Sequence, residues 1–333
     1  MQSLLKPIIG PKKEIHDLSG RVALVIGGAL GIGYQISRAF VLNGARVIMV
    51  NRQEDQGQAA INAIKKEAGE KAQIEWFGCD LANLRDVKKT FTSFCEREKR
   101  LDLLILSAGI NANQYSETKD NIDRHFQVNW LSQFYVCNLL FPLLRKTSKM
   151  ADTPPPRIVW ESSEVHRAAP PGTQFGSIKE INNSAVGAAE LYARTKLAVI
   201  LGVKYGFVDR VIKPRQDDIF VLSVHPGTVT TAMQQQWKEA YPGLLGKLIT
   251  TTMLAVGRSP EQGSFSALYA ASSPEIEKRG WNGYYFTDPS HPGKESKQAT
   301  NPKLGENLWE LSHWLIRERL GEDAMVDWGV TKQ

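Results

Sequence analysis

Short runs of apolar residues alternate along the chain with longer segments in which apolar residues recur every three or four positions. The short runs are bounded by glycine, proline or polar residues, as strands are, and the longer segments have helical spacing. This alternation predicts a parallel sheet covered by helices. The predicted strands are 22–26, 46–50, 73–78, 101–106, 157–161, 219–224 and 281–286, and the predicted helices are 31–43, 54–68, 84–97, 121–145, 191–211, 260–271 and 304–320.

The alternation is interrupted neither by internal repeats nor by a linker that would divide the chain into domains. We therefore expect a single α/β domain, a Rossmann-type doubly wound parallel sheet of about seven strands with helices on both faces. The expected divisions are an N-terminal extension over 1–19, the domain over 20–290 and a C-terminal helical extension over 291–333.

The composition is that of an ordinary soluble globular protein, with 333 residues, 42% hydrophobic and 23% charged. The net charge of +6 is spread along the chain without a Lys/Arg block, so nucleic-acid binding is not expected. The first 19 residues lack the apolar core of a signal peptide or membrane span, and no His/Cys/Asp cluster has metal-ligand spacing. The three cysteines have no C-x-x-C spacing. We expect a cytoplasmic protein with free thiols, without a metal or a transmembrane segment.

A glycine-rich turn lies between the first predicted strand and the first predicted helix. It contains Gly27, Gly31 and Gly33, with Ile32 between the last two. Glycines at such a turn let the backbone approach a pyrophosphate at a helix N-terminus, although the G-x-x-x-G-x-G spacing differs from the commoner G-x-G-x-x-G. The turn predicts dinucleotide binding, and a merely flexible strand–helix connection is the alternative.

The second predicted strand ends at Asn51-Arg52, and no acid follows until Glu54. An acid at this place holds the ribose 2′-hydroxyl of NAD, whereas an arginine suits the 2′-phosphate of NADP. Arg52 therefore favours NADP(H) over NAD(H), unless it is only a surface arginine at the end of a strand.

Tyr192 and Lys196 are four positions apart in a predicted helix and so lie on one face. An ammonium close to a phenol favours the phenolate and lowers its pKa towards the range useful for acid–base catalysis. Taken alone, the spacing is equally that of a half-exposed helical pair.

From about residue 20 to 290 the chain resembles the short-chain dehydrogenase/reductase family. Ile26 stands where the family usually has threonine, and Ser107 replaces the asparagine of an N-A-G motif. The resemblance implies catalytic roles for Ser163, Tyr192, Lys196 and Asn129. It also implies cofactor contacts by the glycine turn and by Asn51, Arg52, Asp80, Leu81, Ser107, Ala108, Gly109, Asn129, Tyr192, Lys196, Pro226, Gly227, Val229 and Thr231.

The resemblance implies hydride transfer between a nicotinamide and a carbonyl carbon. Tyr192 would exchange the proton with the substrate oxygen, and Ser163 would hydrogen-bond that oxygen. Lys196 would lower the pKa of Tyr192 and hold the nicotinamide ribose, while Asn129 would fix a relaying water.

A finer resemblance is to the retinol dehydrogenase and WW-domain oxidoreductase-like carbonyl reductases, through the insert between Ser163 and Tyr192. Residues 232–257 resemble a substrate lid, and their apolar side chains favour a lipophilic carbonyl or alcohol; core packing or a dimer patch is the alternative. The residues expected to edge the pocket are Asn111, Asn113, His166 and Phe175.

Three functional hypotheses follow. The leading one is an NADPH-dependent oxidoreductase that interconverts a carbonyl and an alcohol. A homodimer, an assembly common in the family that the chain resembles, is one arrangement open to it. The others are an NADP-binding sensor or scaffold without turnover, and a retinoid or sterol dehydrogenase working at a membrane surface.

Overall fold

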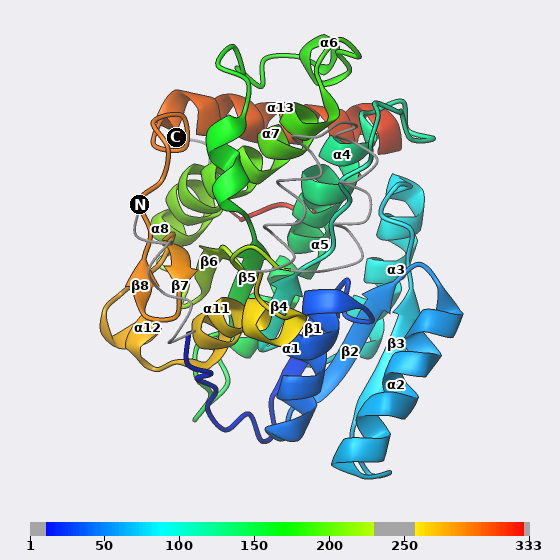
Figure 1. Ribbon diagram of the computed structural model, residues 1–333, viewed down its shortest axis with the longest axis vertical. Coiled ribbons are helices and arrows are strands. Elements are labelled where there is room, and N and C mark those ends of the chain that lie inside the picture. Colours follow the sequence, from blue (N-terminus) through cyan, green and yellow to red (C-terminus); the bar gives the residue numbers. More distant parts are fainter. Residues whose placement is uncertain (1–10, 230–256, 330–333) are drawn as a thin grey trace.

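The computed structural model describes residues 11–229 and 257–329 (Figure 1). Eight strands form one sheet in the order β3-β2-β1-β4-β5-β6-β7-β8, and only the last pair is antiparallel. This confirms the predicted doubly wound sheet and adds one short edge strand. The strands are β1 Val22–Ile26, β2 Arg46–Asn51, β3 Ile74–Gly78, β4 Leu103–Leu106, β5 Arg157–Glu161, β6 Phe220–Val224, β7 Tyr285–Asp288 and β8 His291–Pro292.

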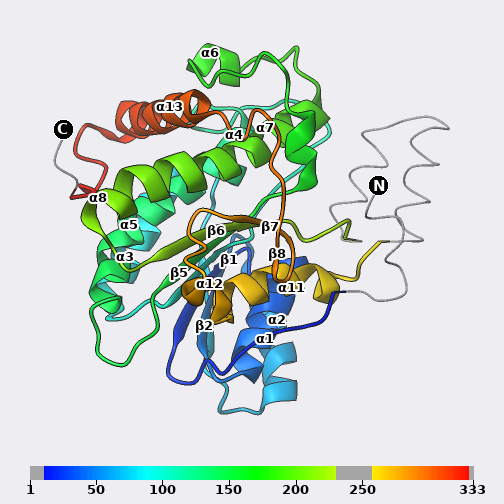
Figure 2. The ribbon, with the colours of Figure 1, turned by 90° about the vertical axis from the view of Figure 1, so that its left-hand side faces the viewer.

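Helices cover both faces of the sheet (Figure 2). On one side lie α1 Gly31–Leu42, α2 Glu54–Ala68, α11 Pro260–Ser272 and α12 Glu275–Lys278. The other side carries α3 Leu84–Arg97, α5 Ser132–Thr147 and α7 Ala188–Leu201, with α13 Pro302–Leu320 packed outside them. The remaining helical pieces are α4 Arg124–Phe126, α6 Ile178–Ile181, α8 Lys213–Arg215, a 3₁₀ turn over Glu164–Ala168, and π-helical stretches over Gln127–Leu131 and Gly202–Ile212.

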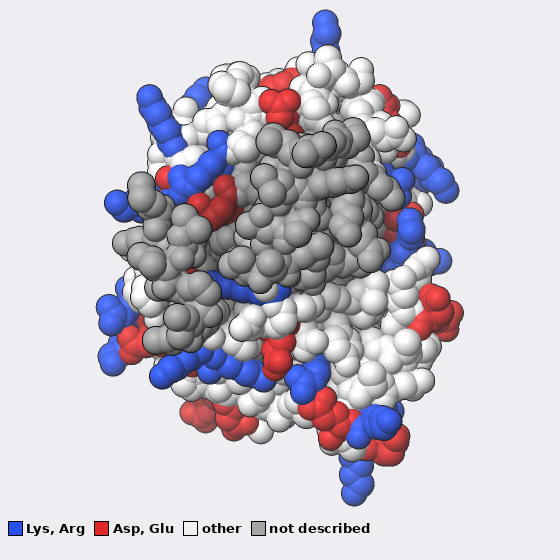
Figure 3. Space-filling view, viewed as in Figure 1, with Lys and Arg blue, Asp and Glu red and all other residues white. Residues whose placement is uncertain are grey.

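Strand side chains alternate between two separate apolar cores. In β5, Ile158 and Trp160 join the core beneath α3, α5 and α7, whereas Val159 joins the core beneath α1 and α11. Because side chains alternate along a strand, Glu161 follows Val159 on the α1/α11 face. The exposed charges are mixed: Lys and Arg lie beside Asp and Glu around the described part of the face in Figure 3.

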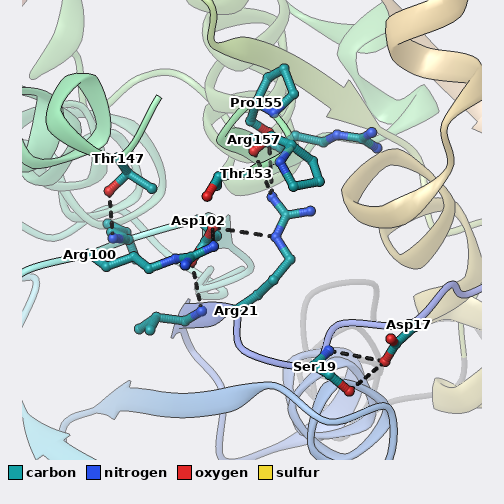
Figure 4. Close-up of polar contacts among 12 residues, drawn as sticks. Asp17, Ser19, Arg21, Arg100, Asp102, Thr147, Thr153, Pro155 and Arg157 are labelled. Carbon is teal, nitrogen blue, oxygen red and sulfur yellow. Dashed lines mark hydrogen bonds and ion pairs between the residues drawn. The ribbon is translucent and has the colours of Figure 1, made fainter. Parts of the chain in front are cut away.

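The amino end of the sheet is closed by a buried ionic cluster (Figure 4). The Asp102 carboxylate accepts hydrogen bonds from Val22 N at 2.8 Å and from Arg100 Nε at 2.7 Å. Arg21 Nε lies 3.5 Å from the same carboxylate, and Leu101 N donates to Thr147 Oγ1 at 2.9 Å. These contacts join β1, β4 and α5 at the end of the sheet opposite the glycine turn.

The last predicted strand is displaced. We expected a strand over 281–286, but Trp281–Tyr284 forms a turn and β7 begins at Tyr285. Gly283 has a φ of 84°, and the Asn282 side chain accepts from Val221 N at 2.8 Å and donates to Ile219 O at 2.7 Å. The Asn282 side chain thus occupies backbone groups at the edge of β6 to which a strand would bond, and β7 begins only at Tyr285.

Candidate active site

The glycine turn presses closely against the end of β4. Gly27 has a φ of 82°, and a Cβ placed on it would lie 2.7 Å from Ala108 N. A Cβ on Gly33 would lie 2.2 Å from Gly27 O. Only glycine fits both places, so the turn forms a close-fitting backbone cradle at the N-terminus of α1. The residues present therefore fit a bound pyrophosphate.

Asn51 and Arg52 differ in how free their side chains are. The Asn51 amide donates to Gln53 O at 2.9 Å and accepts from Trp76 Nε1 at 2.6 Å. Arg52 is exposed and makes neither an ion pair nor a hydrogen bond with any residue of the described chain. Trp76, which the sequence analysis missed, packs its indole against Gly57, where a Cβ would lie 2.2 Å away. The Arg52 guanidinium therefore remains available to an anion.

The predicted contacts after β3 and β4 lie beside this turn. Asp80 Oδ1 accepts from Ala82 N at 3.0 Å, and Leu81 O accepts from Ser132 Oγ at 2.6 Å. Ser107 N donates to Ile26 O at 3.0 Å, which fixes the end of β4 against β1. Ser107 thus lies where the carboxyl ends of β1 and β4 meet.

Asn129 lies in the π-helical stretch that precedes α5. Its Oδ1 accepts from Ile110 N at 2.8 Å, and its Nδ2 donates to Ile110 O at 2.9 Å and to Thr195 Oγ1 at 3.1 Å. A Cβ on Gly109 would lie 3.6 Å from Asn129 Oδ1 and 4.0 Å from Lys196 Nζ. Asn129 therefore connects the end of β4 with α7, close to the lysine ammonium.

Lys196 reaches from α7 to the end of β5. Its Nζ donates to Glu161 O at 2.7 Å and lies 5.5 Å from the centre of the Tyr192 ring. Ser162 Oγ donates to Lys196 O at 3.0 Å, and the next residue, Ser163, caps the 3₁₀ turn by accepting from Val165 N at 3.2 Å. The structure thus places Tyr192 and Lys196 at the strand end that leads into Ser163.

Glu161 is a charged group of this site that the sequence analysis missed. It is buried, and neither carboxylate oxygen has a hydrogen-bond partner among residues 11–229 and 257–329. Burial raises its pKa to about 8, against the attraction of Lys196, and burial lowers the pKa of Lys196 to about 8. The detectable signal was an acid that directly follows three apolar strand residues and directly precedes two serines.

The pKa of Tyr192 is raised, whereas the sequence predicted that Lys196 would lower it. Burial is the larger cause, because it disfavours the charged phenolate, and the Glu161 carboxylate adds to it. The expectation from spacing alone considered only the ammonium and neither burial nor a second charge.

The segment after β6 is held by Arg258, another residue that the sequence analysis missed. Arg258 Nη1 donates to Pro226 O at 3.2 Å, and its guanidinium pairs with Asp288. Gly227 has a φ of 85°, and a Cβ on it would lie 2.6 Å from Arg258 Cδ. Val229 pairs with Arg258 through a β-bridge. Thr231 and the predicted lid, apart from Gly257, lie outside the described residues.

Two residues expected to edge the pocket belong instead to the interior. His166 Nδ1 lies 2.7 Å from Ser163 O, and its Nε2 accepts from Ser296 N at 3.0 Å. Phe175 packs against Phe126 with ring centres 6.3 Å apart. Both side chains are fully buried. His166 therefore anchors the segment before α13 to the Ser163 turn.

The residues that the structure describes include no group of His, Cys, Asp and Glu arranged to hold a metal ion. Among the same residues, no helix is both long enough and apolar enough to span a bilayer.

Comparison with known proteins agrees with this architecture. The sequence profile of the short chain dehydrogenase family matches residues 21–168. A WW domain-containing oxidoreductase from Gallus gallus is 32% identical over 311 residues, covering 92% of this chain and 70% of the relative. A polyprenol dehydrogenase from Danio rerio is 30% identical, covering 91% of this chain and 89% of the relative.

Among solved structures, a putative uncharacterized protein from Mycobacterium paratuberculosis superposes with a TM-score of 0.66 at 23% identity, over 91% of this chain and 95% of its own. That likeness shows the fold. The sequence relatives show more: the chain belongs to the short-chain dehydrogenase/reductase family, in the subgroup of the WW domain-containing oxidoreductases. It is an oxidoreductase of a family that uses nicotinamide cofactors.

Proposed function

We propose that the protein interconverts a carbonyl and an alcohol on a lipophilic small molecule, with NADP(H) as cofactor. The observation that carries the proposal is the placement of Tyr192, Lys196 and Asn129 around the ends of β4 and β5, beside the glycine turn. A proton-exchanging group and a backbone cradle for a dinucleotide then lie at the same edge of the sheet, where open α/β sheets bind ligands.

The bound nicotinamide would supply the hydride. In the reductive direction Tyr192 donates its proton to the substrate oxygen, and Ser163 hydrogen-bonds that oxygen and orients it. The Lys196 ammonium stabilises negative charge on the phenol oxygen. Asn129, held by Ile110 and Thr195, fixes the position of α7 relative to β4.

Replacing the phenol tests the mechanism directly. Tyr192→Phe should lower kcat/KM for ketone reduction by about 10²- to 10⁴-fold, because it removes the hydroxyl assigned to donate the proton. Binding of NADPH, followed by its fluorescence, should persist. The exposed Tyr284 offers a matched control, since Tyr284→Phe removes a hydroxyl away from this site.

Full ketone reduction by Tyr192→Phe would contradict the mechanism. NADPH binding without turnover across a broad panel of aldehydes and ketones would instead favour a sensor or scaffold.

Arg52 supports the choice of NADP(H), because its guanidinium is exposed and unpaired within the described chain. A guanidinium can hold a 2′-phosphate with two parallel hydrogen bonds. Arg52→Ala should weaken NADPH binding by about tenfold or more and leave NADH binding nearly unchanged, since only NADPH carries that phosphate. Titration of both cofactors measures this, with Arg317→Ala, an exposed arginine on α13, as control. Tighter binding of NADH than NADPH by the unaltered protein would contradict the assignment.

The lipophilic substrate is supported by the apolar composition of residues 232–257 and by the relative named polyprenol dehydrogenase. For a series of aliphatic ketones, kcat/KM should rise with chain length, because each buried methylene adds about 0.8 kcal/mol of transfer free energy.

A further inference from the structure

The end of β5 carries a buried carboxyl group, and a buried ammonium from α7 is bonded to the backbone of the same residue. Glu161 is 7% exposed and Lys196 is 5% exposed, so water screens neither side chain substantially. The Lys196 ammonium is fixed there by its 2.7 Å hydrogen bond to the backbone oxygen of Glu161 itself. Both groups are therefore held at one residue of the strand, at a place where charge is costly.

The Glu161 carboxylate is unlike a structural buried acid. Its two oxygens lack hydrogen-bond partners throughout the described ranges, although buried carboxylates normally have several. In the same ranges the carboxylate makes no ion pair with a lysine, arginine or histidine side chain. The Lys196 ammonium works against the rise in the pKa of Glu161 that burial causes. The Glu161 carboxylate in turn contributes to the rise in the pKa of Tyr192.

The other charged groups near this strand end are already occupied. Glu164 pairs with Arg167 and accepts a hydrogen bond from Tyr285 Oη at 2.9 Å. Arg258 pairs with Asp288. Burial lowers the pKa of His225, which follows β6, to about 4, so that this imidazole is uncharged at neutral pH. Lys196 and Tyr192 on α7 thus remain, among the described residues, as the groups that respond to Glu161.

We propose that Glu161 is a positioning residue of the active site, which acts through Lys196: the two buried groups titrate as a pair and together set the charge beside Tyr192. The inference rests on the proposed function. When the pair holds two protons, the acid is neutral and the ammonium carries a single positive charge. Release of one proton to solvent leaves a neutral pair, whichever of the two groups keeps the remaining proton.

Titration of the Glu161–Lys196 pair should make the rate of ketone reduction depend on pH. Ketone reduction needs a protonated Tyr192 and a positive charge close to its oxygen, so the reductive rate should fall as the pair loses its proton. Burial raises the pKa of Glu161 and lowers the pKa of Lys196, so both shifts run towards the neutral range. Glu161 keeps the ammonium protonated to a higher pH than burial alone would allow, because an opposite charge favours the charged lysine.

The test is the pH dependence of ketone reduction by Glu161→Gln, which keeps the shape and removes the ionisable group. The falling limb of kcat/KM should move to lower pH by about one unit, the effect of one charge at several ångströms in a partly screened interior. Glu161→Asp, which keeps the charge, should restore the limb at least in part. Glu164→Gln removes a carboxylate three positions away that solvent and Arg167 already screen, and its profile should match the unaltered protein.

A second measurement needs no substrate. The absorbance of tyrosinate is titrated with and without Tyr192, using Tyr192→Phe in both the unaltered and the Glu161→Gln backgrounds. The Tyr192 contribution should appear at lower pH when Glu161 is absent, because the carboxylate opposes phenolate formation. Should Glu161→Gln fail to fold, Glu161→Val removes the same charge and resembles its strand neighbour Val159.

A pH profile of Glu161→Gln that superimposes on that of the unaltered protein, or an unchanged Tyr192 titration, would overturn the proposal. Absence of turnover with every carbonyl would contradict the proposed function alone, since the absorbance titration would still decide whether Glu161 is coupled to Tyr192.

Discussion

The two ends of the sheet each contain a buried carboxylate on neighbouring strands, and they are treated in opposite ways. Asp102, just before β4, accepts hydrogen bonds from Val22 N and Arg100 and lies against Arg21. The carboxylate of Glu161, at the end of β5, has no such partner among the described residues, and Lys196 bonds to the backbone oxygen of Glu161 instead. A carboxylate whose hydrogen bonds are satisfied holds strands together, whereas one without partners remains easy to protonate.

The largest effect is expected at the amino end. Asp102→Ala should lower the free energy of unfolding by about 3–5 kcal/mol, because it removes the carboxylate that faces the buried Arg21 guanidinium and leaves the Val22 N–H without an acceptor. Chemical denaturation measures this, and kcat/KM of the molecules that remain folded should be unchanged. Asp17→Ala, at the same end of the sheet, removes an exposed carboxylate that bonds to the neighbouring Ser19, and it should change stability little (Figure 4). If both variants lost the same free energy of unfolding, Asp102 would have no special role in holding the strands together.

At the carboxyl end the effect on stability should be smaller and should depend on pH. Glu161 has a pKa in the folded protein of about 8, above the ordinary value of 4.5. Its contribution to stability is therefore fully present below about pH 4.5 and is lost as the pH rises through about 8. Glu161→Gln does not titrate, so its stability relative to the unaltered protein should improve by about 1 kcal/mol or more between pH 5 and pH 8.

Unfolding by denaturant at those two pH values measures the change. A stability difference between the two proteins that is the same at pH 5 and pH 8 would show that Glu161 does not titrate in this range.

Much of the fold could be predicted because its signals are local. The spacing of apolar residues and the glycine after the helix predicted Glu54–Ala68 with the bounds that α2 has, and the apolar run Val22–Ile26 predicted β1. The strand predicted over 281–286 was wrong for a reason that lies far away in the sequence. The Asn282 side chain bonds to backbone groups of β6 and of the residue before it. The run of aromatic residues that suggested a strand carries no information about these side-chain hydrogen bonds.

The candidate site divides in the same way. Tyr192 and Lys196 could be identified from their spacing and the family motifs, and the structure brings Asn129 towards them. Their electrostatics could not be predicted, because the pKa of Tyr192 depends on burial and on Glu161, which belongs to a different element. His166 appeared to border the pocket from its place in a loop, yet it is buried against Ser296, 130 positions further along the chain.

The bridge between Val229 and Arg258 has a consequence for how this enzyme could diversify. The chain returns to the point where it left the sheet, and Arg258 ties that return to Pro226 and Asp288. With both attachment points fixed, the entropy of closing the intervening chain grows only slowly with its length, by about 0.6 kcal/mol for each doubling. Segments of different length and composition could therefore be exchanged between these two anchors, while the residues at the end of β5 and on α7 stay as they are.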